Sequence, residues 1–157
     1  MSLSKSLKKM GLDKKSVVRS SENILLYPRI YIYDRNQLDS VAYFGCISND
    51  KKSFISYFEN NAKGVIKLKI GGSPLVREAG EYADSIKTLP LNTLIDRLST
   101  RDSTSTPIVD SKARFLVVYY WNPDIIDRDI IKNYKYLKKY SANHPELKIQ
   151  VLAVLNE

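Results

Sequence analysis

The sequence feature that most constrains the fold is an apolar run in the last third of the chain. Residues 114–121 read Arg-Phe-Leu-Val-Val-Tyr-Tyr-Trp, so large apolar side chains occupy both alternating sets of positions. A strand with one face in water alternates apolar and polar residues, whereas a strand covered on both faces does not. The run therefore predicts a central strand buried between two helical layers.

A helix and a second apolar strand are expected after this run. The helix follows residues 122–124, ends near residues 143–145, and has an apolar stripe made of Ile126, Ile130, Tyr134 and Leu137. Residues 147–155 then form another apolar strand. Strand, helix and strand make a βαβ unit, in which we expect parallel strands and a right-handed crossover.

The first half of the chain predicts a β-hairpin. Residues 27–34 and 40–44 are rich in aromatic and β-branched residues, and residues 35–37 form a polar turn between them. Three helices and one strand are expected around the hairpin: helices at residues 3–12, 50–63 and 91–98, and a strand at residues 65–70. Apolar side chains at helical spacing define the helical faces: Leu3, Leu7 and Met10 before Gly11; Phe54, Tyr57 and Phe58; and Leu91, Leu94, Ile95 and Leu98.

Length and composition favour one α/β domain. The chain has 157 residues, of which 43% are hydrophobic and 27% charged, which is enough for one core and too apolar for a disordered protein. Residues 99–113 contain many Ser, Thr and Asp residues and are expected to form a flexible loop. No apolar stretch is long enough to cross a bilayer, and the first residues lack the apolar core of a signal peptide. We therefore expect a soluble protein, cytoplasmic at face value.

The net charge of +8 is concentrated in two segments. Residues 1–20 hold six basic residues and one acidic residue, and residues 60–77 hold four basic residues and no acidic one. Because residues 1–20 have few large apolar side chains, we expect them to be poorly packed or to dock only on a partner. Basic segments can also bind phosphate groups or anionic surfaces by charge alone.

The sequence excludes several kinds of chemistry. Cys46 is the single cysteine and His144 the single histidine, so a chain has no CxxC pair, no internal disulfide and no cysteine-rich zinc site. Residues 71–73, Gly-Gly-Ser, lack a Walker lysine and are interpreted as a turn. The acidic residues Asp124, Asp127 and Asp129 are interpreted as helix-capping residues. We identify no catalytic residue, metal site or cofactor.

Residues 114–157 resemble the opening βαβ unit of thioredoxin-like proteins, especially bacterial thiol-disulfide oxidoreductases of the redoxin type. In that family a strand of the form xxVVxFW leads into W-C-x-x-C and a helix. Here residues 115–121 match the strand and its tryptophan, but Asn122 and Ile125 stand at the two cysteine positions. Residues 27–45 are similar to a later part of the same fold, and Pro28 matches the family's cis-proline before a strand. The resemblance implies a thioredoxin-like, three-layer mixed sheet without a redox centre. It also implies that strand 28–34 lies in the same sheet as strand 114–121 and antiparallel to it, with Pro28 close to the Trp121–Asn122 turn and a cis Tyr27–Pro28 bond.

The two similar segments occur in the opposite order from the family. A circular permutation would account for this order, with the hairpin first and the βαβ unit last. Alternatively, the chain carries the tail of one unit and the head of another, and completes its sheet by pairing with a second chain in a homodimer. A generic three-layer α/β domain without any relation to thioredoxin also fits the pattern.

The preferred functional interpretation is a non-redox binding or structural module that recognises an extended peptide or a protein partner. The candidate ligand-binding residues are Trp121, Asn122, Pro123 and Pro28, because in the resembled fold the turn beside the proline binds extended chains. A strand-end tryptophan packed in the core is the other interpretation of Trp121. The alternative function is a basic module that binds nucleic acid or an anionic surface through residues 1–20 and 60–77. We do not expect dithiol oxidoreductase activity.

Overall fold

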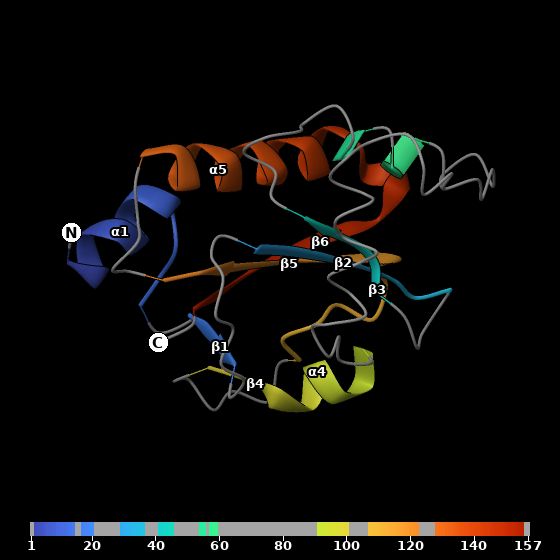
Figure 1. Ribbon diagram of the computed structural model, residues 1–157, viewed down its shortest axis with the longest axis horizontal. Helices are drawn as coiled ribbons and strands as arrows, with labels where there is room; N and C mark the ends of the chain where they lie inside the picture. The colour runs from blue at the N-terminus through green and yellow to red at the C-terminus, as the bar shows by residue number, and fades with distance from the viewer. Residues whose placement is uncertain are drawn as a thin grey trace.

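The chain folds around one mixed β-sheet. The computed structural model describes residues 2–14, 17–20, 29–36, 41–45, 54–55, 57–59, 91–100, 107–122 and 128–155. Within these ranges six strands pair in the order β3-β2-β5-β6-β1-β4 (Figure 1). The sheet contains parallel and antiparallel pairs and is covered by helices, so the α/β class predicted from the sequence is confirmed.

The predicted βαβ unit forms the centre of the sheet. Strand β5 (Phe115–Trp121) runs parallel to β6 (Ile149–Leu155), in a register that extends from Phe115↔Ile149 to Trp121↔Leu155. Helix α5 (Arg128–Asn143) lies between them in sequence, and residues 123–127 lie outside the described residues. A short 3-10 helix, η2 (Pro145–Leu147), precedes β6, so this strand begins two residues later than predicted. All seven side chains of β5 are buried, as expected for a strand covered on both faces.

The predicted hairpin lies on one side of this unit. Strand β2 (Arg29–Asp34) pairs antiparallel with β3 (Val41–Gly45), with a register shift between Ile32 and Tyr33. The other edge of β2 pairs antiparallel with β5, from Arg29↔Tyr120 to Asp34↔Phe115. This arrangement confirms the expectation that the hairpin and the apolar strand share a sheet. Pro28 and the Tyr27–Pro28 bond lie outside the described residues.

Helices cover both faces of the sheet. Helices α1 (Leu3–Met10) and α5 lie on one face, and α4 (Leu91–Arg97) lies on the other (Figure 1). The face toward α1 and α5 is rich in aromatic side chains. Residues 54–55 and 57–59 are helical and add Phe54, Tyr57 and Phe58 to this face. The face toward α4 contains Leu91 and Leu94 packed on alternate residues of the same strands. The alternation of side chains along each strand thus divides the core into two apolar clusters.

The N-terminal segment is part of this core, so the expectation that residues 1–20 are poorly packed is wrong. Leu7 and Met10 of α1 are 2% and 4% exposed and pack with α5 and the sheet. Gly11 ends the helix at a φ of 73°, a conformation that glycine adopts without strain. The chain then enters strand β1 (Val18–Ser20), which pairs parallel with β6. A few apolar residues at helical spacing suffice to dock a short helix when a strand follows it into the sheet.

Strand pairing also changes the expected end of the helix at residues 91–98. Leu98 leaves α4 and starts β4 (Leu98–Ser99), which pairs antiparallel with β1 through Ser20↔Leu98 and Arg19↔Ser99. Tertiary pairing therefore overrides the helical spacing at this position. Within the segment expected as the loop 99–113, Val109 and Ala113 are buried. The strand expected at residues 65–70 lies outside the described residues.

Among the described residues, no helix combines the length and the apolarity that crossing a bilayer requires.

Candidate functional site

The turn after β5, where the sequence predicts a ligand site, begins at a deeply buried residue. The Trp121 side chain is fully buried and packs in the cluster that α1 and α5 cover. Asn122 follows it and is half-buried. The other two predicted site residues, Pro28 and Pro123, lie outside the described residues, although β2 reaches this end of β5 through the pair Arg29↔Tyr120. A ligand at this turn would have to use backbone groups, since the indole ring faces the core.

The indole nitrogen of Trp121 is also buried. Its Nε1 has no hydrogen-bond acceptor among the described residues. A buried donor without an acceptor costs about 1–3 kcal/mol, which is less than the roughly 4–6 kcal/mol gained by burying the apolar surface of the ring. Packing therefore accounts for Trp121 without a ligand.

His144 has a local structural role. Its Nδ1 lies 2.9 Å from the Tyr140 carbonyl oxygen near the end of α5, and its ring stacks on Tyr140 at a centroid distance of 4.2 Å. Asp129 lies in the first turn of α5, whereas Cys46, residues 71–73, Asp124 and Asp127 lie outside the described residues. In the described part of the chain, no group of three His, Cys, Asp or Glu side chains could hold a metal ion.

An ion pair between a buried aspartate and a half-buried arginine lies at the opposite end of β5. Asp34, which is 3% exposed, is 3.6 Å from the Arg114 guanidinium, and its Oδ1 accepts a 3.0 Å hydrogen bond from the Asn36 backbone N–H. Burial raises the pKa of the nearby Tyr57 phenol, Asp34 raises it further, and Arg114 lowers it. The Tyr57 ring packs against Phe115, at the start of β5. These groups join β2, β5 and the helical residues 57–59, so their evident role is structural.

The feature of the fold that offers a binding surface is the outer edge of β6. Pairing with β1 is limited to Val18↔Val154 and Arg19↔Leu155, so among the described residues no strand pairs with the first five positions of β6 on that side. The Phe115 N–H donates to the Lys148 carbonyl, which therefore points toward β5. Because backbone groups alternate direction along a strand, the N–H and C=O of Val151 point toward the outer edge, whereas the next outward carbonyl, that of Ala153, already takes part in the pairing with β1.

A cleft lies along this edge. It has a volume of about 800 Å³. Its floor is β6 from Ile149 to Ala153, and α5 contributes Tyr134, Lys138 and Ser141. Leu12 follows α1, Val17 precedes β1, and Val18 begins β1; all three line the cleft. The segment before β5 contributes Asp110, Lys112 and Ala113. The cleft thus combines an apolar lining with outward-directed backbone groups.

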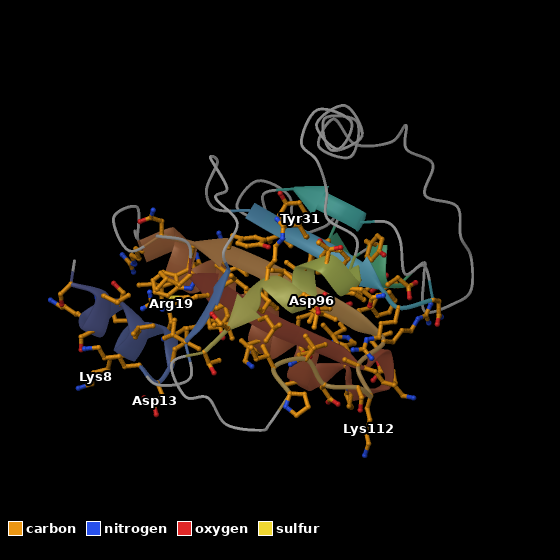
Figure 2. All side chains as sticks on the ribbon, turned by 90° about the horizontal axis from the view of Figure 1, so that it is seen from below. Lys8, Asp13, Arg19, Tyr31, Asp96 and Lys112 are labelled. Carbon is orange, nitrogen blue, oxygen red and sulfur yellow. The ribbon has the colours of Figure 1, made fainter. Side chains whose placement is uncertain are left out.

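Basic side chains dominate the charge around the cleft. Lys112, Lys138 and Lys148 are exposed at its rim, and among the described residues that line it Asp110 is the one acidic residue. Lys112 comes from the connection before β5 and points away from the body of the molecule (Figure 2). Burial raises the pKa of the Tyr134 phenol, which favours a neutral hydroxyl group in the lining. The electrostatic potential of the cleft therefore favours a ligand with negative charge.

The entrance of β6 is held in place by several hydrogen bonds. Lys148 adopts a left-handed φ of 51°, which is strained for a residue with a side chain. Its carbonyl oxygen accepts hydrogen bonds from the Arg114 and Phe115 N–H groups at 2.8 and 3.2 Å. The Ser141 hydroxyl donates to the Ile149 carbonyl at 2.7 Å, and Gln150 bonds to the backbone of Ile108 and Asp110 at 2.9 and 2.7 Å. The strand edge beside the cleft is therefore rigidly anchored where it begins.

Sequence reasoning missed this cleft. Its basic residues are spread over three segments, and none of them belongs to a recognisable motif. The one available signal was the largely apolar strand at residues 147–155, but its pattern describes side-chain burial and carries no information about the pairing of its outer edge.

Comparisons with known proteins give no match for this chain, whether with protein-family models, with curated proteins or with solved structures.

Proposed function

We propose that the protein is a non-redox binding module that recognises an extended peptide, which it takes up as an added strand along β6. The observation that carries the proposal is the cleft beside Val151, where the strand edge has outward-directed backbone groups and where no described strand pairs with β6. Strand addition at an open sheet edge is a common way to bind extended chains, because main-chain hydrogen bonds provide affinity and side-chain pockets provide specificity.

The shape of the cleft supports a peptide of several residues. Five positions of β6 line it, and one strand residue extends about 3.3 Å, so about 16 Å of extended chain fits beside the strand. The main-chain hydrogen bonds of such a chain would centre on Val151, because the Ile149 carbonyl is bonded to Ser141 and the Ala153 carbonyl takes part in the pairing with β1. The apolar lining can receive every second side chain of such a peptide. The remaining side chains would face the rim.

The charge at the rim supports an acidic peptide. Lys112, Lys138 and Lys148 can form charge-assisted hydrogen bonds with carboxylates, and in the described part of the lining only Asp110 has the opposite sign. Such contacts increase association rates and discriminate against basic competitors.

A thioredoxin-like domain with permuted element order is compatible with this function. The hairpin strand β2 lies next to β5 and antiparallel to it, as the resemblance implies for the strand after the matching proline. The parallel pair β5 and β6 supports the same assignment for the βαβ unit. Under this proposal the domain has kept the sheet and uses a strand edge in place of the missing redox centre.

Binding of designed peptides tests the proposal. The probe is a fluorescently labelled ten-residue peptide in which Glu alternates with Val, and its control is the same peptide with Lys at each Glu position. We expect saturable fluorescence polarisation for the Glu peptide and much weaker binding for the Lys peptide. The double variant Lys138→Glu/Lys148→Glu should weaken binding at least about tenfold, because it removes two attractive charges and adds two repulsive ones.

A matched variant locates the site. Lys132 and Lys139 are exposed on α5 but do not line the cleft, so Lys132→Glu/Lys139→Glu changes the net charge equally. This control should retain most of the affinity. Equal losses for the two double variants, or a loss confined to Asn122→Ala at the β5 turn, would contradict a site along β6.

A separate assay tests the prediction that the protein has no dithiol oxidoreductase activity. Because Cys46 is the single cysteine, we expect no turnover in an insulin-reduction assay with a dithiol donor. Turnover that Cys46→Ser abolishes would show that the protein uses a one-thiol route.

A further inference from the structure

The helices on one face of the sheet carry an unusual excess of positive charge. Helices α1 and α5 together contain eight basic residues, whereas Asp129 is the only acidic residue in either sequence. By contrast, α4 on the opposite face contains one acidic and one basic residue, Asp96 and Arg97. Much of the net charge of +8 is therefore presented on the side of the sheet that α1 and α5 cover.

Four of these cations form a straight stripe along α5. Arg128, Lys132, Lys135 and Lys139 follow one another at spacings of four, three and four residues, and all four are exposed. Side chains at these spacings lie on one face of a helix, and eleven residues span about 16 Å of helix axis. Like charges so arranged repel one another and lower helix stability slightly, so folding alone gives no reason for the stripe.

The stripe passes a small pocket at the contact between α5 and α1. This pocket has a volume of about 320 Å³, and the described residues that line it are Lys9 from α1 and Arg128, Ile131 and Lys135 from α5. Three cationic side chains from two helices therefore surround one nearly buried isoleucine. The buried residues Leu7 and Met10 dock α1 on the core, which fixes the position of Lys9 beside the stripe.

We infer that this face binds the phosphate backbone of a nucleic acid, and that the pocket between α1 and α5 holds one of its phosphoryl groups. The planar guanidinium of Arg128 can bond to two phosphate oxygens at once, and Lys9 and Lys135 contribute point charges from two other directions. Lys132 and Lys139 continue the stripe toward neighbouring phosphates. This site is separate from the peptide cleft along β6 and does not depend on it.

The arrangement favours a linear polyanion over a membrane surface. Helices that bind membranes insert an apolar face among the lipids. Here the large apolar side chains of α1 and α5 that the structure describes belong to the core or pack against it, and the exposed cations form a line along the helix. A phosphate backbone presents its charges in such a line, and binding then follows from release of its counterions.

Oligonucleotide binding tests the inference. The probe is a labelled 20-nucleotide single strand of mixed sequence, compared with the matching duplex, and binding is measured by fluorescence polarisation from 50 to 200 mM NaCl. We expect affinity to fall steeply with salt, with a logarithmic slope of about −3 on the single strand if about four phosphates are contacted. The double variant Lys9→Ala/Lys135→Ala should weaken binding about tenfold and make the slope shallower.

A control variant with the same loss of charge makes the test specific. Lys112→Ala/Lys148→Ala removes two exposed lysines from the rim of the β6 cleft, away from the stripe. This control should bind oligonucleotides nearly as well as the original chain, and both variants should keep its circular dichroism spectrum and melting temperature. Equal weakening by the two variants, or binding that does not depend on salt, would overturn the inference. Tighter binding to phosphatidylserine vesicles than to either oligonucleotide would also overturn it.

Discussion

The two central strands, β5 and β6, have the same length and direction but differ in how completely their edges are paired. Strand β5 pairs with β6 along all seven residues and with β2 from Tyr120 to Phe115. Strand β6 pairs with β5 equally well, but on its other side the described pairing with β1 covers only Val154 and Leu155. Both strands bury most of their side chains. Burial of side chains and satisfaction of strand edges are therefore separate properties of a sheet.

This difference in edge pairing assigns the two strands different roles, stability for β5 and binding for β6. A strand paired on both sides can contribute to the core but cannot accept another strand. An open edge keeps its backbone donors and acceptors available, at the risk of unwanted pairing, which charged side chains such as those of Lys112 and Lys148 reduce. The variants below test this separation, from the largest expected effect to the smallest.

The largest expected effect is the loss of the ring at the end of β5. Trp121→Ala should lower the free energy of unfolding by about 3–5 kcal/mol, because it removes a fully buried ring from the main cluster. Urea denaturation followed by circular dichroism measures the change. A loss below about 1 kcal/mol would mean that the ring is not packed as described.

A similar but smaller effect is expected at α1, which packs against α5. Leu7→Ala should lower the free energy of unfolding by about 2–4 kcal/mol, since Leu7 is 2% exposed in the core. Lys8→Ala on the exposed side of the same helix is the control and should change it by less than about 0.5 kcal/mol. If both substitutions had the same small effect, α1 would not belong to the core.

Proline substitutions at paired positions compare the two strands directly. Val117 of β5 and Val151 of β6 are register partners and both are buried. The Val117 N–H points toward β6, so Val117→Pro removes a ladder hydrogen bond, whereas the Val151 N–H points to the open edge. We expect Val117→Pro to be more destabilising by about 1–3 kcal/mol in urea denaturation. Equal effects would show that the outer edge of β6 is already hydrogen-bonded.

The smallest expected effect is on the pH dependence of stability, through Tyr57 near the start of β5. Burial raises the pKa of Tyr57 above its ordinary value of 10.0, so the folded chain retains a proton that the unfolded chain releases. This contribution to stability is complete below pH 10 and is lost as the pH rises above it. Tyr57→Phe should therefore reduce the stability lost between pH 8 and 11 by about 1 kcal/mol, measured by urea denaturation. An unchanged pH dependence would place the Tyr57 hydroxyl in solvent.

The sequence predicted those parts of the fold that depend on side-chain patterns. The apolar residues of β5 and the stripe of Tyr134 and Leu137 in α5 identified the βαβ unit, and the aromatic hairpin was assigned to the same sheet as β5. Local patterns failed where distant segments decide the outcome. Leu98 fits a helical stripe, yet its partner Ser20 lies far away in sequence and draws it into a strand. The burial of α1 likewise depends on where β1 joins the sheet.

The candidate binding site could not be predicted for a related reason. The sequence favoured the turn at Trp121 and Asn122 because an aromatic residue there matches a family pattern, but the side chain of Trp121 is buried. The cleft along β6 exists because the described β1 is short and pairs only near the end of β6. Its positive charge comes from three lysines that are distant in sequence. No residue pattern within one segment encodes such an arrangement.

Hydrogen exchange at the edge of β6 tests the central claim most directly. The Val151 N–H points to the cleft and the Leu152 N–H points to β5, so NMR should show faster exchange for Val151 in the free protein. Saturating Glu/Val peptide should slow exchange at Val151 at least about tenfold and leave Leu152 unchanged, because the peptide would add a strand at the outer edge. Protection of Val151 equal to that of Leu152 without peptide, or no change at Val151 when the peptide is bound, would contradict the account.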